Sequence, residues 1–587
     1  MSFVELRAHS AFSFGDGGVG PEALARRAKE LGYSTIGLTD HADLGGIVRF
    51  AVTCREQNIR PVVGGEFLVD GRPLALLARD ATGFRNLAAL VTASRVGNLR
   101  RWAKSTATRG RPRLSWAQVA ERSEGLHLLT GPASGTLTSL LGHGHTDEID
   151  QLLRRYRDAF EHRIAIEVHL HYAGRREAAL AGALIALANR VGIPWVATQN
   201  PRYIDDGTRL VHEILTALRH GTEVPTATSN GLLHPNDQWR LLSAEEMALR
   251  WKNVTAGLDE SARIAEACQF NLRWVRPPLP TFKVPDGHDD RSFLRHLAFE
   301  GARTRWGDPG PKEIAQIDHE LGIIGRLGFA GFFLVMWDAV RFAHERGILA
   351  QGRGSAANST VAYCLGITAV DPVKHGLLFE RFLSEARVDG LTEAPDIDVD
   401  IEHDRREEVL DYVYHRYQRS HSAITGVTQL YSACTAIQDS FRAFGLPAEQ
   451  AFKLSKRLRG HGCRDGIRVL EEGLAAAQGF DLDTPVARTI LEALAAFDDL
   501  PRLRSTHPGG FVLSSEPLGE FCPIEATSMG RTIIQFDKDD LDSVGIPKFD
   551  FLGLGGLALI RRAFNAIEAR TGRSLSMYPG YLGLYNL

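Results

Sequence analysis

The chain has 587 residues, 44% hydrophobic and 24% charged, and its 68 basic and 71 acidic side chains leave a formal net charge of -3. This length corresponds to about four domains, and the composition excludes a disordered, collagen-like or small disulfide-stapled chain. The near-neutral charge argues against a generally cationic nucleic-acid binder, so any such contact must come from local basic patches. The 6 cysteines contain no CxxC pair, which favours a reducing compartment. No apolar run reaches about 18 residues, so we expect a cytoplasmic protein without a membrane span.

The first third of the chain alternates amphipathic helices with short apolar runs. Residues 21–31 predict a helix that Gly32 ends, and we expect strands at residues 34–38, 60–63 and 193–198. Such alternation predicts a parallel sheet that can close as a barrel, with functional groups at the carboxyl ends of its strands. Polar residues do follow these strands, in the segments TDH (39–41), GGE (64–66) and QNPR (199–202).

The rest of the chain contains two segments that mark its organisation. Residues 95–113 include no acidic side chain, and this segment reads as a solvated loop or, alternatively, as a contact to a phosphate backbone. Several prolines up to Pro285 indicate a domain boundary there. The remaining expected elements are a helix at 337–346, a Gly/Ser segment at 352–359 before another helix, a strand at 395–402, a helix that Asp404 and Glu407 cap, a mostly helical region at 426–500, a strand-rich region at 510–551 and a helix at 557–569.

The strongest chemical signal is the segment PDIDVDI at residues 395–401. In a strand, alternate side chains share a face, so Asp396, Asp398 and Asp400 project together while the apolar residues between them pack inward. Neighbouring carboxylates repel one another, and a divalent cation relieves this repulsion most simply. Carboxylates on adjacent rungs of a strand are typical of two-metal phosphoryl or nucleotidyl transfer. A solvated acidic edge strand is the alternative.

Two further segments suit phosphate chemistry. The loop GRGSAANS (352–359) precedes a predicted helix, so its backbone N–H groups and the helix dipole can face an anion. It lacks the lysine of a Walker A loop, and alone it is equally explained as a turn with a helix cap. Its Arg353 and its place before the aspartates favour a triphosphate clamp. In PKFDFLGL, Asp550 lies between two phenylalanines with Lys548 on its face, which suits either a structural ion pair or a metal site.

The N-terminal region offers His9, Asp16, His41 and Glu66, which are residue types that suit a zinc, manganese or iron cluster. Their spacing is not diagnostic, because a single histidine is more often a hydrogen-bonded core residue than a metal ligand.

The motifs together resemble those of a known family. LRAHSAFSFGDG, GLTDHADLGG and PVVGGEF resemble the start of a PHP domain. QGRGSAANSTVAYCLGITAVDP, LLFERFLSEARV, PDIDVDIEHDRREEV, HPGGFVLS and QFDKDDLDSVGIPKFDFLGL resemble the palm of the bacterial DNA polymerase III alpha subunit, a C-family polymerase. GRGSAAN and PDIDVDIEHDRREEV look most like the error-prone, translesion branch, whereas KFDFLGL looks more like the replicative spelling.

This resemblance implies an α/β multidomain protein. We expect a PHP-type β/α barrel followed by a polymerase-beta-like nucleotidyltransferase palm with an inserted helical thumb. The expected divisions are the PHP domain and linker at 1–285, the palm at 286–425 and 501–570, the thumb at 426–500 and a C-terminal tail at 571–587 that ends before the fingers.

The resemblance also implies a mechanism and its residues. Asp396, Asp398 and Asp550 would hold two Mg²⁺ ions, with Asp400 as a tuning neighbour, for attack of a primer 3′-OH on a nucleoside triphosphate. Gly354 and Ser355 match the triphosphate-binding residues of the family. The expected electrostatic helpers are Arg353, Arg381 and Lys548, and the expected DNA-binding residues of the thumb are Lys453, Lys456, Arg457 and Arg459. A solvated helix face is the alternative for these last four residues.

The PHP motifs depart from the family pattern. His9, Asp16, His41 and Glu66 match ligand positions, but the other ligand positions hold Arg7, Pro73, Pro132, Asn200 and Arg202. We therefore expect that the PHP metal cluster and its phosphoesterase activity are lost, with one weakly held metal as an alternative. Arg7 and Arg202 would then replace the metals as fixed positive charges facing Asp16 and Glu66.

The sequence favours one function over two alternatives. The favoured function is a DNA-directed DNA polymerase, error-prone and truncated before the fingers, that acts on primer-template DNA and dNTPs and meets a sliding clamp or other subunits through regions outside this chain. The first alternative is a catalytically silent fragment that binds DNA or polymerase partners. The second is a PHP phosphoesterase that depends on His9 and His41.

Overall fold

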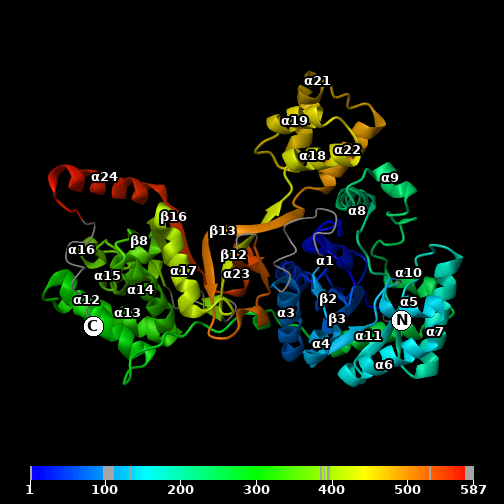
Figure 1. The fold of residues 1–587 in the computed structure, drawn as a ribbon, viewed down its shortest axis with the longest axis horizontal. Coiled ribbons are helices and arrows are strands. Elements are labelled where there is room, and N and C mark those ends of the chain that lie inside the picture. Colours follow the sequence, from blue (N-terminus) through cyan, green and yellow to red (C-terminus); the bar gives the residue numbers. More distant parts are fainter. Residues whose placement is uncertain are drawn as a thin grey trace. The chain divides into compact units, whose positions relative to one another are not determined.

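The computed structural model describes residues 3–96, 112–132, 134–383, 387–388, 391–392, 397–527 and 530–575. They form two compact units (Figure 1). Unit 1 comprises Met1–Trp274, Thr428–Ser505 and Pro523–Gly530, and unit 2 comprises Val275–Val427, Thr506–Cys522 and Arg531–Leu587. Each unit is thus assembled from segments that lie far apart in the sequence.

The sheet of unit 1 is mixed rather than wholly parallel. Its strands, in spatial order, are β1 (Thr35–Leu38), β2 (Arg60–Val69), β3 (Arg72–Ala78), β5 (Leu126–Leu129), β6 (Ile164–Val168) and β7 (Trp195–Ala197), and β4 (Arg113–Leu114) pairs with β2. Strand β3 runs antiparallel to both β2 and β5, whereas β1/β2, β5/β6 and β6/β7 are parallel. The expectation of a parallel sheet was therefore wrong at β3. The cause is local: Asp70 and Gly71 both have positive φ and close a two-residue hairpin, which is the conformation an Asp-Gly pair favours.

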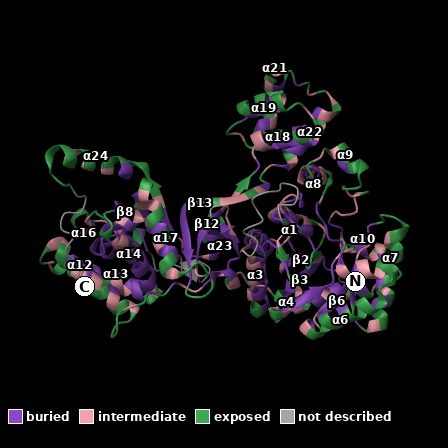
Figure 2. Ribbon diagram, viewed as in Figure 1, coloured by how far each residue is buried: buried purple, intermediate pink, exposed green. Residues whose placement is uncertain are grey.

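Helices cover this sheet and hold its apolar face. They are α1 (Pro21–Glu30), α2 (Ile47–Glu56), α3 (Ala81–Val96), α4 (Trp116–Glu121), α5 (Thr136–His143), α6 (Thr146–Phe160), α7 (Arg175–Val191), α8 (Asp206–Arg219), α9 (Val224–Ser229), α10 (Ala244–Arg250) and α11 (Ala256–Ala267). The expected helix at 21–31 is confirmed by α1. Leu6, Val62, Leu77, Leu129 and Val196 form one buried cluster along the strands. Figure 2 shows buried residues on the strands and exposed residues along α6 and α7.

A group of helices later in the chain also belongs to unit 1. It consists of α18 (Ala433–Ala443), α19 (Ala448–Arg457), α20 (Cys463–Val469), α21 (Ala475–Ala477) and α22 (Pro485–Ala496), and it confirms the expected helical region. Ile437, Phe441 and Ile490 share one hydrophobic core with Val211 and Ile214 of α8. Burial of these apolar side chains from water holds the later helices against α8.

Unit 2 is built on a second sheet. Its strands, in spatial order, are β15 (Thr532–Asp537), β12 (Ser422–Leu430), β13 (Pro501–Leu513), β16 (Phe549–Leu554), β11 (Ile397–Glu402) and β8 (Ala350–Arg353). Residues 422–427 of β12 and 506–513 of β13 fall in this unit. Strand β11 is parallel to β16 and antiparallel to β8, and β13 is antiparallel to β16. The shorter strands are β14 (Ile524–Ala526) in unit 1 and the antiparallel pair β9 (Arg387–Val388) and β10 (Leu391–Thr392) in unit 2.

Helices pack on this second sheet through an aromatic core. They are α12 (Asp290–Trp306), α13 (Pro311–Leu327), α14 (Ala330–Glu345), α15 (Thr360–Cys364), α16 (Pro372–His375), α17 (Arg406–Tyr417), α23 (Lys538–Val544) and α24 (Gly555–Thr571). The rings of Phe332 in α14 and Phe549 in β16 stack with their centroids 4.3 Å apart. Stacking of this kind adds to the area-dependent gain from burial. This packing fixes the position of β16 in the sheet.

The start of α17 differs from the prediction. The predicted cap of α17 was wrong, because Arg405 and not Asp404 stands at its N-cap position. The Asp404 carboxylate instead pairs with Arg562 at 2.8 Å.

Among the described residues, no single helix is long and apolar enough to cross a membrane. Only α13 and α14 taken together reach that length and composition, and they are bent by 114°.

Candidate active site and a second polar cluster

Two aspartates lie opposite each other on neighbouring parallel strands of unit 2. Asp398 of β11 is the register partner of Asp550 of β16. Ile397 and Val399 are buried in the core below, so Asp398 projects from the other face, and directly paired side chains of parallel strands point to the same side. Asp550 itself is only 5% exposed. Strands in a sheet lie about 4.8 Å apart, so the two carboxylates form one acidic site. Asp396 lies outside the described residues.

The loop before α15 brings a positive charge to these acids. Arg353 of β8 is the register partner of Asp398 on its other side. Its Nε lies 3.6 Å from Asp398 Oδ2 and 3.4 Å from Asp400 Oδ1. Burial raises the pKa of Asp400, and Asp398 raises it further, while Arg353 opposes both effects. A Cβ added at Gly354, where φ is +65°, would lie 3.9 Å from Asp398 Oδ2, so the start of the Gly/Ser loop faces the acidic site.

The expected use of the following helix by an anion was wrong. Glu320 of α13 occupies the N-terminus of α15: it accepts hydrogen bonds from the Ser359 hydroxyl at 2.8 Å and from the Thr360 and Val361 amides at 2.9 and 3.0 Å. Burial raises the pKa of this carboxyl. Because Glu320 already holds these amides, the dipole of α15 serves the fold rather than a ligand. The loop residues Gly354–Asn358 stay candidates for binding a phosphate.

Histidine 507 is a residue of this site that sequence reasoning did not single out, although it begins the quoted segment HPGG. Its Nδ1 accepts hydrogen bonds from the amides of Gly509 and Gly510 at 3.1 and 2.6 Å, and it lies 3.6 Å from Asp550 Oδ1. Burial lowers the pKa of His507, as do Lys548, Lys538 and Arg406, while Asp398 raises it. Its place at the start of the HPGG motif was the sequence signal that could have identified this residue.

Arg406 is a second such residue, and it supports the strand that carries Asp550. Its Nε donates a hydrogen bond to the Phe551 carbonyl at 2.6 Å. Burial lowers the pKa of Arg406, and so does the nearby Arg531, whereas Asp550 raises it. This guanidinium therefore fixes the backbone of β16 one residue after Asp550.

The other predicted positive residues are Lys548, Arg381 and four residues in or just after α19. Lys548 is largely buried, and its Nζ is 3.8 Å from Asp542 Oδ1. Arg381 is exposed at the end of a 3-10 turn, Phe379–Arg381. On α19 and just after it, Lys456, Arg457 and Arg459 are exposed, and Lys453 pairs with Glu449 at 2.8 Å.

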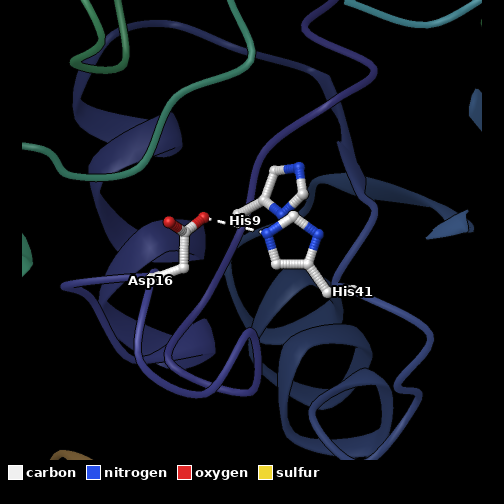
Figure 3. Close-up of side chains that lie close together, drawn as sticks. All are labelled: His9, Asp16 and His41. Atoms are coloured by element: carbon white, nitrogen blue, oxygen red, sulfur yellow. Dashed lines mark hydrogen bonds and ion pairs between the residues drawn. The ribbon is translucent and has the colours of Figure 1, made fainter. Parts of the chain in front are cut away.

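A second polar cluster lies in unit 1 (Figure 3). It contains His9, Asp16 and His41, whose potential ligand atoms lie within 4.8 Å of one another. His41 Nε2 lies 2.9 Å from Asp16 Oδ2, and His41 Nδ1 lies 2.9 Å from Glu66 Oε1. His9 Nδ1 is 3.0 Å from the Ser13 hydroxyl. The four predicted residues are therefore brought together.

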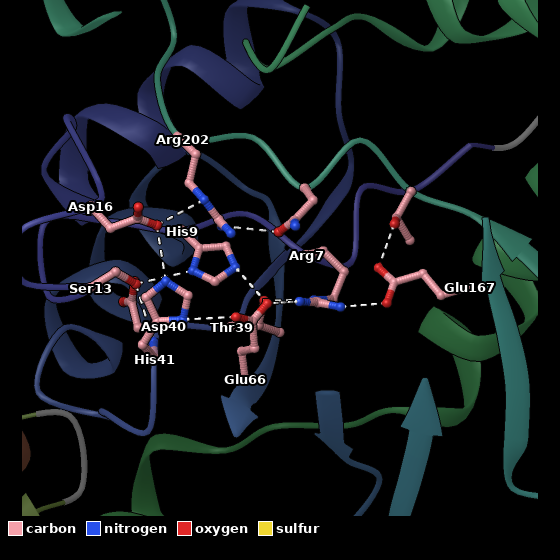
Figure 4. A network of polar contacts seen from close by, with 12 residues as sticks. Arg7, His9, Ser13, Asp16, Thr39, Asp40, His41, Glu66, Glu167 and Arg202 are labelled. Carbon is pink, nitrogen blue, oxygen red and sulfur yellow. Dashed lines mark hydrogen bonds and ion pairs between the residues drawn. The ribbon is translucent and has the colours of Figure 1, made fainter. Parts of the chain in front are cut away.

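Arginines surround the carboxylates of this cluster (Figure 4). Asp16 pairs with Arg202 at 2.9 Å and with Arg219 at 2.8 Å. Fully buried Arg7 bonds Glu66 through one nitrogen and Glu167 through another. Arg219 and Glu167 were not expected here; each lies far in sequence from its partner. These ion pairs join three arginines to three carboxylates, those of Asp16, Glu66 and Glu167.

The pKa directions agree with this pairing. Burial alone would raise the pKa of Asp16, but Arg202, Arg219 and His41 outweigh it and hold that pKa well below its usual range. Burial is likewise outweighed at Glu66, by His41 and Arg7. A metal ion would have to displace guanidiniums from both oxygens of Asp16, and breaking such buried ion pairs is costly. Both oxygens of Asp16 and one oxygen of Glu66 therefore already have guanidinium partners.

Two parts of the chain match known protein domains. Residues 5–171 match the PHP domain, and residues 292–553 match the bacterial DNA polymerase III alpha NTPase domain. The chain therefore contains a PHP domain followed by a bacterial DNA polymerase III alpha NTPase domain.

Its relatives include several error-prone DNA polymerases. The protein of that name from Pseudomonas aeruginosa is 39% identical over 581 residues, covering 98% of this chain and 53% of the relative. The one from Pseudomonas fluorescens is 38% identical over 582 residues, with the same coverage. The one from Mycobacterium tuberculosis is 37% identical over 592 residues, covering 97% of this chain and 51% of the relative. The chain thus spans about half the length of the curated relatives it matches.

Proposed function

We propose that this chain is the catalytic part of an error-prone DNA polymerase and transfers deoxynucleotides to a primer 3′-OH under the direction of a DNA template. The observation that carries the proposal is the pairing of Asp398 with Asp550 in register on neighbouring strands, with Arg353 on the opposite side of Asp398. Support also comes from the two domain matches and from the error-prone polymerases among the relatives. The substrates would be primer-template DNA and dNTPs, and a sliding clamp or other subunits would bind outside this chain.

The acidic site suits divalent metal ions, because its carboxylates are adjacent and acidic oxygens are the ligands Mg²⁺ prefers. Asp398 and Asp550, with Asp396 by resemblance, would hold two Mg²⁺ ions, which when bound promote ionisation of the 3′-OH and neutralise charge on the phosphates. Arg353, Gly354 and Ser355 would hold the triphosphate of the incoming nucleotide.

The other residues would act through charge and position. Lys548 and Arg381 would stabilise negative charge on the phosphates. Lys453, Lys456, Arg457 and Arg459 would follow the DNA backbone without reading its sequence. In this scheme the palm comprises residues 286–425 and 501–570, the thumb 426–500, the C-terminal tail 571–587, and the PHP domain with its linker 1–285 as a β/α barrel.

For the second cluster we propose a structural role without metal. Three arginines already pair with three of its carboxylates, so Arg7 and Arg202, joined by Arg219, would stand where other PHP domains hold metal ions. Hydrolysis of phosphoesters at His9 and His41 is therefore not part of the proposed function.

Primer extension by the 587-residue chain with primer-template, dNTPs and Mg²⁺ tests the proposal. We expect incorporation by the parent and a loss of at least about 100-fold in Asp398→Asn, because a metal ligand is removed. Asp404→Asn is the matched control, since Asp404 lies on the surface nearby and pairs with Arg562; it should match the parent. Equal activity in Asp398→Asn would refute the assignment, and salt-sensitive duplex binding without incorporation would identify a silent fragment.

A further inference from the structure

We propose that His507 is a further substrate-contacting residue of the acidic site, and that its Nε2–H donates a hydrogen bond to a phosphate oxygen of the substrate. The phosphate belongs either to the incoming nucleoside triphosphate or to the last phosphodiester of the primer. This inference rests on the proposed polymerase function and names one more residue for it.

The hydrogen bonds of the ring determine which nitrogen carries the proton. The amides of Gly509 and Gly510 can only donate, and both donate to Nδ1. Nδ1 must therefore present its lone pair, and in the neutral ring the proton lies on Nε2. The 3.6 Å approach of Nδ1 to Asp550 Oδ1 is then a contact between two acceptors and not a hydrogen bond. Nε2 makes no hydrogen bond within the part of the chain that the structure describes, so the ring offers one donor.

The two glycines of the HPGG segment make room for this arrangement. A Cβ added at Gly510 would lie 2.9 Å from His507 Nδ1 and 2.8 Å from the Thr425 hydroxyl. A Cβ added at Gly509 would lie 2.4 Å from Leu552 Cδ2 and 3.2 Å from Asp550 Oδ1. Gly509 thus allows β13 to lie close to Leu552 and Asp550 of β16, and Gly510 leaves room for the His507 ring beside Thr425 of β12.

The surroundings of the ring indicate what the donor meets. The positive charges of Lys548, Lys538 and Arg406 lower the pKa of His507, and the negative charge of Asp398 raises it. The carboxylate of Asp550 is a second acidic neighbour, 3.6 Å from the ring. The ring is partly exposed, with 20% of its side chain accessible. A half-buried donor among cations, beside carboxylates of the metal-binding type, is suited to an anionic oxygen ligand. A phosphate group of the polymerase substrates is the anion that this chemistry supplies.

Two substitutions separate contact with the phosphate from support of the fold. Asparagine in His507→Asn places an oxygen near the position of Nδ1, so it can still accept the two amide hydrogen bonds, but it lacks the distal donor. Glutamine in His507→Gln reaches the position of Nε2 with an N–H donor and loses the proximal acceptor. If His507 only stabilises the turn through Nδ1, the asparagine variant should keep ligand affinity and the glutamine variant should lose it. If His507 contacts the phosphate through Nε2, the glutamine variant should keep ligand affinity and the asparagine variant should lose it.

The assay uses the 587-residue chain with Mg²⁺ and two ligands in separate arms: a non-hydrolysable α,β-imido deoxynucleoside triphosphate and a primer-template duplex. We expect His507→Asn to keep the thermal stability of the parent and to bind one of the ligands about tenfold more weakly, or about 1.4 kcal/mol. We expect His507→Gln to retain most of that affinity. Weaker triphosphate binding assigns the oxygen to the nucleotide, and weaker duplex binding assigns it to the primer.

Unchanged affinity of His507→Asn in both arms would overturn the inference and leave the polymerase proposal standing. A parent chain that binds neither ligand would overturn both. Loss of activity confined to Asp398→Asn, with His507→Asn equal to the parent, would likewise keep the polymerase function and exclude the histidine contact.

Discussion

Removal of the positive charge of Arg7 should strongly destabilise unit 1. Arg7 is fully buried and bonds the carboxylates of Glu66 and Glu167, which are also buried. Arg7→Met keeps most of the side-chain volume but leaves both carboxylates without this guanidinium. Breaking a buried ion pair from one side costs about 3–5 kcal/mol, because an uncompensated charge remains.

The pKa of Glu167 gives a second route to the magnitude. Burial would raise this pKa, but Arg7 and His169 outweigh it and lower it from 4.5 to about 2, which corresponds to about 3 kcal/mol. Because the folded-state pKa is depressed, this stability is present above pH 4.5 and is lost as the pH falls from 4.5 towards 2. In Arg7→Met, this acid-dependent loss should be smaller, because only His169 and Thr198 still lower the pKa of Glu167, so the difference between variant and parent should shrink below about pH 4.

Thermal unfolding between pH 3 and pH 8 measures the effect, and hydrogen exchange of peptides from β6 localises it. The control is Arg27→Met, which alters an exposed pair with Glu30 and should change stability by less than about 1 kcal/mol. Adding Glu167→Gln to Arg7→Met should recover part of the loss, since one uncompensated charge is removed. If Arg7→Met costs no more than Arg27→Met at pH 7, the conclusion that the buried ion pairs of Arg7 stabilise this cluster is wrong.

Three other predictions concern the active-site elements and the DNA contact. Glu320→Ala should cost about 1–3 kcal/mol by leaving buried amides of α15 without acceptors, seen as a lower melting temperature; no change would contradict the capping role. Gly510→Ala should lower the free energy of unfolding by about 1–3 kcal/mol, because the added methyl group crowds Thr425 and His507. Gly182→Ala in α7 is the control: nothing lies within 4 Å of its added Cβ, so this substitution should be neutral or stabilising by up to about 1 kcal/mol. Equal effects of the two substitutions on stability would refute the packing argument. Lys456→Gln should reduce the salt dependence of duplex binding by about one unit of slope, measured by fluorescence anisotropy, and more than Lys453→Gln, because Lys453 already pairs with Glu449; the opposite order would exclude this face.

Local patterns predicted many elements correctly. The alternation around Asp398 predicted a strand, and β11 confirms it, with Ile397 and Val399 buried. The apolar period before Gly32 predicted α1. These successes share a cause: side-chain periodicity within a few residues decides which face of an element is buried.

Two features of the structure differ from the predictions. The antiparallel course of β3 follows from the Asp-Gly turn at residues 70–71, a signal that the expectation of repeated β/α units overlooked. The N-terminus of α15 looked open to an anion because the loop before it is rich in glycine and serine. Glu320, from a helix earlier in the chain, occupies it instead, and no local pattern indicates that partner.

The sequence by itself determined which residue types stand at the candidate sites: aspartates alternating with apolar residues, a Gly/Ser loop with an arginine, and a PHP motif in which arginines, prolines and an asparagine stand at ligand positions. Only the tertiary structure decided their partners. It placed Asp398 beside Asp550, brought Arg219 to Asp16 and Glu167 to Arg7, and set His507 against Asp550. The physical reason is one of range. Periodicity acts between neighbours along the chain, whereas strand register and buried ion pairs join distant segments, and the packing of the whole unit selects them.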